Sequence, residues 1–88
     1  MNTPETKQIM ERFYSALEAI IAKGEIRGIA TFCKLYDIDR RNFYAQRNDP
    51  NRNIFQMSWL QVMVKDFGVN AEWLLTGKGR MFKTTSPL

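Results

Sequence analysis

Apolar side chains recur at helical spacing through most of this chain, and no segment alternates apolar and polar residues as a strand would. Thr3 followed by Pro4 is a typical helix start, because the hydroxyl can cap the helix and the missing proline N–H is not needed there. The apolar stripe that follows consists of Ile9, Phe13, Leu17, Ile20 and Ile21. We therefore expect a first helix that begins at Pro4 and that Gly24 ends.

A second apolar stripe has the spacing i, i+3, i+4 and i+7 and predicts a short helix; it consists of Ile29, Phe32, Cys33 and Tyr36. Residues 37–39 leave room only for a tight turn. Asp39 can cap a third helix, from Arg40 to about Arg47, by accepting a backbone N–H of its first turn. The Asn-Asp-Pro-Asn segment at 48–51 breaks that helix, and an extended loop leads to residue 57.

Two further helices complete the pattern. Ser58 to Gln61 has the spacing of a capping box and predicts the start of a fourth helix. The expected inner face of that helix consists of Leu60, Met63, Val64 and Phe67. Gly68 ends it, Asn70 caps a short fifth helix, and Gly77 closes the fifth. The predicted fold is therefore all-α, with five short helices.

Eighty-eight residues, 44% of them apolar, suffice for one compact domain. We assign residues 1–82 to that domain and residues 83–88 to a flexible polar tail. No apolar run approaches the roughly 18 residues of a membrane helix, and the first residues lack a secretion signal. The one cysteine, Cys33, cannot form an internal disulfide. These features predict a soluble cytoplasmic protein with no membrane partner.

The net charge of +4 is unevenly distributed along the chain. Residues 1–28 carry four basic and four acidic side chains, residues 29–56 carry five and three, and residues 57–88 carry four and two. An anionic partner is therefore expected to bind the middle or the end of the chain, although composition does not identify the anion.

The third predicted helix has separate polar and core faces. At roughly 100° per residue, three side chains lie within about 100° of Arg40 around the helix axis: Arg41, Tyr44 and Asn48. Phe43 lies at about 300° and can point into the core. Two short helices joined by a tight turn make a helix-turn-helix unit, whose second helix can enter the major groove of DNA.

The polar face has the chemistry needed to read bases. Arginine can donate two hydrogen bonds to guanine, asparagine can pair with adenine, and a small alanine allows contact with a thymine methyl group. The candidate base-contacting residues are Arg40, Arg41, Tyr44, Ala45 and Asn48. The candidate phosphate-contacting residues, which would fix register rather than read sequence, are Arg47, Asn51, Arg52 and Asn53.

Each of these signals also has an ordinary structural interpretation. Adjacent arginines are commonly solvated or ion-paired, a tyrosine such as Tyr44 is commonly half-buried, and loop asparagines commonly form turns. Cys33 lies on an apolar stripe, as expected of a small buried hydrophobe rather than a reactive thiol. Residues 76–79 resemble a phosphate loop faintly and are better interpreted as a helix end. Three aromatic residues are assigned to the core: Phe43, Trp59 and Trp73.

Segment 69–82 reads Val-Asn-Ala-Glu-Trp-Leu-Leu-Thr-Gly-Lys-Gly-Arg-Met-Phe. It is similar to the closing segment of the lambda-repressor-like helix-turn-helix domains, the amino-terminal DNA-binding domains of phage repressors and related bacterial regulators. The resemblance covers about residues 7–82, and its packing positions include Phe32, Tyr36, Ile38 and Phe43. It implies a five-helix bundle whose helices 2 and 3 form the helix-turn-helix, usually as a dimer on a two-fold operator. Three positions depart from the pattern, since Asp37 replaces a common glycine, Cys33 a usual small alanine and Gln46 a usually apolar residue.

By position, the resemblance also assigns base reading to Arg40, Arg41, Tyr44 and Ala45. The resulting hypothesis is sequence-specific binding of double-stranded DNA by a transcriptional regulator or repressor, with a homodimer expected if it binds as those domains do. The alternative is a protein–protein interaction module, antitoxin- or anti-repressor-like, which predicts an apolar patch on the 40–48 face. We expect no enzyme activity, cofactor, metal or small-molecule substrate, because the chain has no histidine and no inward-facing carboxylate pair.

Overall fold

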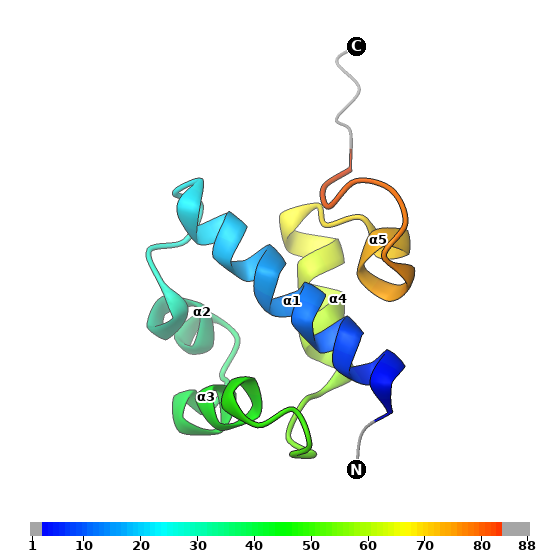
Figure 1. Cartoon of the computed structure of the whole chain (residues 1–88). Coiled ribbons are helices and arrows are strands. Elements are labelled where there is room, and N and C mark those ends of the chain that lie inside the picture. The colour runs from blue at the N-terminus through cyan, green and yellow to red at the C-terminus, as the bar shows by residue number, and fades with distance from the viewer. Residues whose placement is uncertain (1–2, 84–88) are drawn as a thin grey trace.

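The computed structural model describes residues 3–83, and within them the chain folds into five α-helices (Figure 1). They are α1 (Pro4–Ala22), α2 (Ile29–Leu35), α3 (Arg40–Asn48), α4 (Met57–Phe67) and α5 (Ala71–Thr76). This range contains no β-strand, and its one extended pairing is an isolated antiparallel bridge between Val69 and Phe82. The prediction of five helices and no strand is confirmed. None of the helices within residues 3–83 is long and apolar enough to cross a membrane.

Local capping places most helix ends where the sequence predicted them. The side chains of Thr3, Asp39 and Asn70 each accept a backbone N–H from the first turn of the following helix, at 3.0 to 3.1 Å. Gly68 and Gly77 end α4 and α5 in the left-handed conformation, which satisfies carbonyl groups of the last turn. These ends are determined by neighbours in the sequence, which is why they could be predicted.

The start of α4 differs from the prediction. The helix begins at Met57, and its N-cap is Gln56, whose carbonyl accepts the N–H of Trp59 at 3.0 Å. Ser58 is therefore already inside the helix, and the predicted capping box is wrong. Gln56 is the last residue with extended backbone dihedrals, φ −119° and ψ 147°. The helix therefore begins where the extended loop ends, at Met57.

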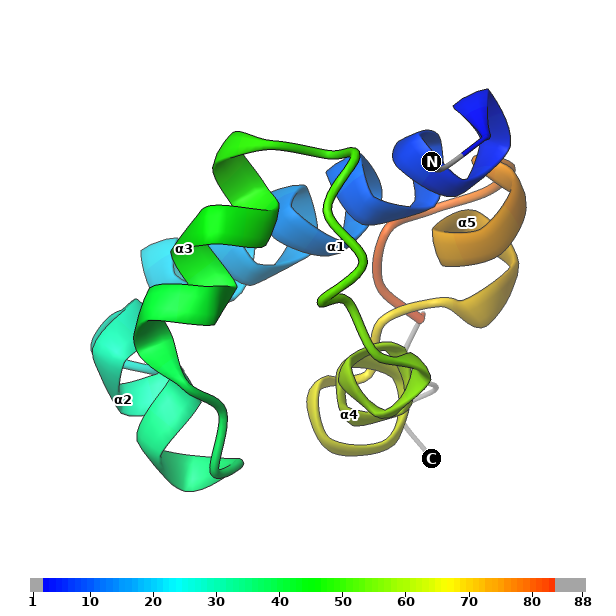
Figure 2. The ribbon, with the colours of Figure 1, turned by 90° about the horizontal axis from the view of Figure 1, so that it is seen from below.

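The core is organised around Phe13 of α1, which is fully buried. Its ring centroid lies 5.1 to 6.3 Å from those of five other aromatic rings: Tyr14, Phe32, Phe43, Phe55 and Trp59. These residues join α1 to α2, to α3, to the loop before α4 and to α4. Viewed from below, α1 runs along one edge of the bundle, with α2 and α3 toward the left and α4 and α5 toward the right (Figure 2). Trp73, which the sequence assigned to the core, is only half-buried.

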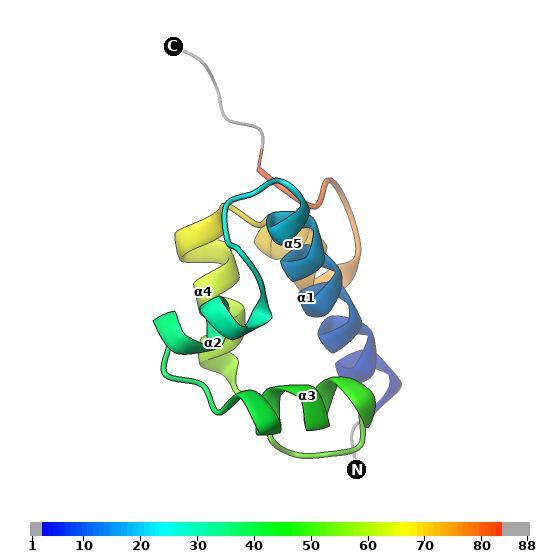
Figure 3. The ribbon, with the colours of Figure 1, turned by 90° about the vertical axis from the view of Figure 1, so that its left-hand side faces the viewer.

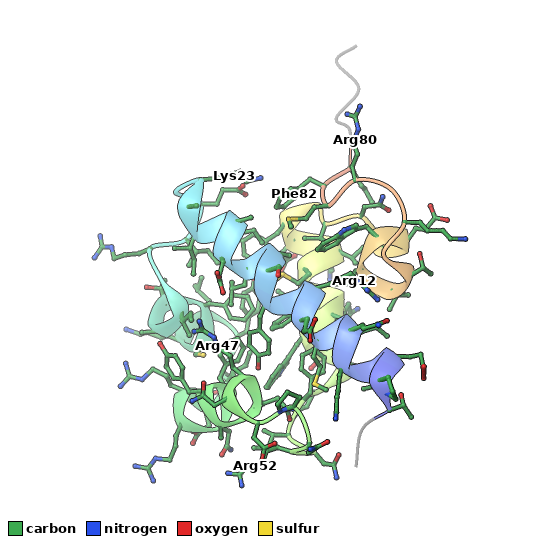
Figure 4. The ribbon with its side chains drawn as sticks, in the orientation of Figure 1. Arg12, Lys23, Arg47, Arg52, Arg80 and Phe82 are labelled. Carbon is green, nitrogen blue, oxygen red and sulfur yellow. The ribbon has the colours of Figure 1, made fainter. Side chains whose placement is uncertain are left out.

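The segment after α5 folds back onto the bundle. Phe82 pairs with Val69, and the Lys23 ammonium group lies 3.6 Å from the centroid of the Phe82 ring. Figure 4 labels Lys23 and Phe82 at this end of α1. Lys83, the first residue of the predicted tail, donates its backbone N–H to a carbonyl at the end of α4 at 2.9 Å. The remainder of the predicted tail, 84–88, lies outside the described residues.

Candidate nucleic-acid interface

Helix α3 and the loop that follows it form one end of the molecule (Figure 3). The helix is anchored from inside by Phe43 and Gln46, whose side chains are 0% and 1% exposed. The Phe43 ring centroid lies 5.1 Å from that of Trp59, and the Phe43 carbonyl accepts the Tyr14 hydroxyl at 3.2 Å. Burial raises the pKa of Tyr14 well above its ordinary value, and the charge of Arg47 partly opposes this rise. The inward orientation predicted for Phe43 is confirmed.

The turn at residues 36–39 sets the direction in which α3 leaves α2. Asp37 has a φ of 55°, the left-handed conformation that aspartate tolerates better than most residues and that the resemblance associates with glycine. Asp39 follows as the N-cap of α3. Beside the turn, Tyr36 donates its hydroxyl to Asp66 Oδ2 at 2.9 Å, and burial together with this bond raises the pKa of Tyr36 to about 12. The turn is thus tied to α4 as well as to α3.

The side of α3 opposite its two buried residues carries the predicted base-contacting residues. Four of them are exposed, Arg40, Arg41, Tyr44 and Asn48, and the fifth, Ala45, is half-buried. At roughly 100° per residue, Arg41 and Asn48 project most directly away from the core. Arg40 lies at the edge of this face toward α2, where its charge partly opposes the rise that burial causes in the pKa of Cys33. We call these five residues the outward face of α3.

Arg47 lies on the flank of α3 that faces α1. Its Nη2 is 3.7 Å from Glu18 Oε2, and the two side chains are 40% and 64% exposed. The side-chain view shows Arg47 directed back toward α1, whereas Arg52 is directed away from the molecule (Figure 4). The predicted phosphate-contacting residue Arg47 is thus in an exposed ion pair with a residue 29 positions earlier, which the sequence did not reveal.

The loop between α3 and α4 is shaped by its own hydrogen bonds. Asp49 Oδ1 accepts the N–H of Asn51 at 3.1 Å, and the Asp49 carbonyl accepts the N–H of Arg52 at 3.0 Å. The side chains of Asn51, Arg52 and Asn53 are all exposed. The loop that carries these three predicted phosphate-contacting residues lies at the same end of the molecule as α3 (Figure 3).

Sequence reasoning assigned no role to Gln46, which the structure places among the most buried residues. Its Oε1 accepts the backbone N–H groups of Ile54 and Phe55 at 2.8 and 2.9 Å. Its Nε2 donates to Met10 Sδ at 3.2 Å. The sequence signal that could have identified this role is an amide side chain at a helical position that is usually apolar. A buried amide has two acceptor lone pairs and two donors, so it needs hydrogen-bond partners in the fold.

A second surface feature lies away from α3. An apolar groove of about 420 Å³ runs between α4 and α5, over Leu60, Val64 and Leu74. Met57 and Leu75 also line it and are 78% and 49% exposed. Among residues 3–83, no group of three histidine, cysteine or acidic side chains is arranged to hold a metal ion.

Comparison of the chain with family models, with curated proteins and with solved structures found no match in any of the three. Any function assigned to this protein therefore depends on the residues of its own surface. The outward face of α3 and the loop after it are the region where exposed arginine and amide side chains gather.

Proposed function

We propose that this protein binds double-stranded DNA in a sequence-specific manner, with α3 in the major groove, and that it acts as a transcriptional regulator of the repressor type. In this proposal α2 and α3 are the helix-turn-helix of a lambda-repressor-like domain. The observation that supports it most strongly is the division of α3, whose Phe43 and Gln46 are buried while Arg41, Tyr44 and Asn48 are exposed. A helix held from inside that presents hydrogen-bonding side chains outward fits the shape and chemistry of the major groove.

The proposed roles follow the positions around α3. Arg41 donates two hydrogen bonds to O6 and N7 of a guanine, and Asn48, about two helical turns further along α3, pairs with an adenine. Arg40 and Tyr44 contact neighbouring bases at the edge of the face, and Ala45 allows the backbone to approach a thymine methyl group. These five residues supply sequence information.

The phosphate contacts come from both sides of α3. Arg47 contacts one strand from the flank beside α1, and Arg52 contacts the backbone from the loop together with Asn51 and Asn53. Such contacts position the protein without reading sequence. They make affinity fall with salt, with a log–log slope of roughly −0.9 for each phosphate neutralised.

The test is a selection from random DNA duplexes by the purified protein, followed by affinity measurements at several salt concentrations. We expect one enriched motif and an affinity for it that falls steeply as salt rises. Binding without an enriched motif would eliminate base reading by α3, and the absence of binding at low salt would eliminate the proposal as a whole.

We further propose that the protein binds as a homodimer whose interface is the groove between α4 and α5. The groove is apolar, and its exposed rim residues, Met57 and Leu75, could enter the same groove of a second copy. Two recognition helices would then read half-sites about 34 Å apart. We expect the selected motif to be palindromic. We also expect light scattering to give the mass of a dimer for the wild type and of a monomer for Leu75→Asp. A non-palindromic motif bound by a monomer would contradict this arrangement.

The alternative function, a protein–protein interaction module, is disfavoured at α3 itself. Its charged outward face lacks the apolar patch that a partner-binding version would present. The groove between α4 and α5 is apolar, but it leaves the arginines of α3 without a role. A heterologous partner bound at that groove, with no DNA binding by α3, would favour the alternative.

A further inference from the structure

The buried amide of Gln46 connects α3 to the loop that precedes α4. One oxygen, Oε1, accepts two consecutive backbone N–H groups, those of Ile54 and Phe55, at 2.8 and 2.9 Å. The other end of the amide is held by Met10 of α1, whose Sδ accepts Nε2 at 3.2 Å. The side chain is only 1% exposed, so its amide has almost no access to water.

A hydrophobic residue would fill this site without making those bonds. Leucine or methionine has a similar volume and suits a position between α1 and α3, as the apolar spacing of the helix would suggest. It would leave the N–H groups of Ile54 and Phe55 without their acceptor, and a buried donor without a partner is unfavourable. The Gln46 amide therefore provides a hydrogen-bond acceptor for backbone N–H groups of the loop, and α3 itself does not need it.

The loop is fixed at both of its ends. At the start, Asp49 closes a turn by accepting the N–H groups of Asn51 and Arg52. At the finish, the Phe55 ring packs against Phe13 and Trp59, with centroids 5.1 and 4.9 Å apart. Gln46 adds a direct link from this second end to α3. The segment between the two ends, 51–53, contains the exposed side chains assigned to phosphate contacts.

We infer that Gln46 is a positioning residue for DNA binding: it fixes the phosphate-contacting loop to α3, so that phosphate contacts and base contacts are made in one register. This inference rests on the proposed function. A loop held in its bound conformation before binding does not have to be ordered by the DNA, so affinity gains from preorganisation. Because the loop contacts phosphates only, loss of the link should weaken binding without changing which bases are selected.

The test compares three variants of the full chain. Gln46→Met removes the acceptor at nearly constant volume. Met10→Leu is the matched control, because it removes the sulfur that accepts Nε2 and leaves the two loop bonds to Oε1 in place. Gln46→Glu, compared with the wild type at the same mildly acidic pH, is the rescue variant: its buried carboxyl is then protonated, its carbonyl oxygen can accept both loop N–H groups, and its hydroxyl can donate to Met10 Sδ. Each is measured by amide hydrogen exchange without DNA, and by affinity for the selected duplex at several salt concentrations.

In Gln46→Met we expect about tenfold faster exchange at Ile54 and Phe55, with little change at Phe43. We expect its salt slope to become shallower by about 0.9 for each phosphate that the loop no longer neutralises, with the selected motif unchanged. Met10→Leu should keep the wild-type slope and the protection of both amides, and Gln46→Glu should restore both. A role in stability alone would instead raise exchange throughout the chain and leave the slope unchanged.

The failures are distinguishable. If the wild-type protein binds no DNA, the proposed function fails whatever the variants do. If the wild type binds and a folded Gln46→Met keeps the full slope, the positioning role is overturned. If Gln46→Met does not fold, Gln46→Glu decides: protected amides with the wild-type slope support the inference, and protected amides with a shallower slope overturn it.

Discussion

Replacing Tyr14 by phenylalanine tests how α3 is attached to the rest of the bundle. The Tyr14 hydroxyl donates to the Phe43 carbonyl at 3.2 Å, and it is the one side-chain hydrogen bond from α1 to the backbone of α3 that is described for residues 3–83. The two rings also pack edge to face, with centroids 5.2 Å apart. Tyr14→Phe keeps the ring and removes only the hydroxyl, so it isolates the hydrogen bond.

At pH 7 we expect Tyr14→Phe to lower the free energy of unfolding by about 1 kcal/mol, the usual net contribution of a buried hydrogen bond. A larger loss is not expected, because the Phe43 carbonyl also accepts an N–H within α3 and keeps one partner.

The difference in the free energy of unfolding between the wild type and Tyr14→Phe should change sign at alkaline pH. Burial raises the pKa of Tyr14 in the folded protein, so the stability that depends on its protonated form is complete below the unfolded pKa of about 10 and is lost as pH rises above it. At pH 11 the unfolded chain gains about 1.4 kcal/mol by ionising Tyr14, while the folded chain keeps it protonated. This exceeds the hydrogen bond of about 1 kcal/mol, so Tyr14→Phe becomes the more stable protein between pH 10 and 11.

Urea denaturation followed by tryptophan fluorescence at pH 7, 9, 10 and 11 measures this reversal, since the buried Trp59 reports on the core beside Phe43. Tyr44→Phe is the matched control, because it removes a phenol from an exposed side chain and should change stability by less than about 0.5 kcal/mol at pH 7. Equal stabilities of Tyr14→Phe and wild type at pH 7 would show that the hydroxyl is not bonded. A constant difference up to pH 11 would show that Tyr14 ionises alike in both states.

Three other predictions concern the proposed DNA-binding face and two turns. Arg41→Ala should reduce the binding free energy by about 1–3 kcal/mol and relax selectivity at one base position, whereas Arg52→Ala should weaken binding to all duplexes alike. Competition binding against duplexes with single-base changes distinguishes the two results. Gly77→Ala should destabilise by about 1–2 kcal/mol in urea denaturation, because φ is +82° and the added Cβ would lie 3.3 Å from Arg12 Nη1. Asp37→Gly should stabilise by up to about 1 kcal/mol by relieving the left-handed φ of 55°, and a loss of stability there would contradict the proposed strain.

Sequence alone predicted those parts of the fold that local chemistry decides. The caps at Thr3, Asp39 and Asn70 could be predicted because the acceptor and its donor are two or three residues apart. The start of α4 could not, because the same rule favoured Ser58 while the path of the loop makes Gln56 the last extended residue. A local signal therefore located the helix but not its first residue.

The candidate site divides in the same way. Helical periodicity was enough to separate Phe43 from Arg41 and Asn48, because both faces belong to one short helix. It could not predict the partner of Gln46, since that amide bonds to loop backbone whose position depends on the packing of Phe55 in the core. Gln46, the polar residue at an apolar position of the helix, is the residue that bonds to a distant part of the fold. A residue that departs from the helical pattern is expected to make such a specific contact.

The ion pair of Arg47 bears on whether its proposed phosphate contact is compatible with the free structure. Arg47 and Glu18 are 40% and 64% exposed and 3.7 Å apart, and exposed pairs of this kind contribute roughly 0–1 kcal/mol. A DNA phosphate could therefore replace the Glu18 carboxylate with little loss of stability. The pair would still orient Arg47 along the flank of α3 before binding, while Arg52 projects from the loop away from the molecule (Figure 4). In the free protein, the carboxylate of Glu18 would hold the Arg47 side chain in a position close to the one it needs for a phosphate. Less side-chain entropy would then be lost when DNA binds.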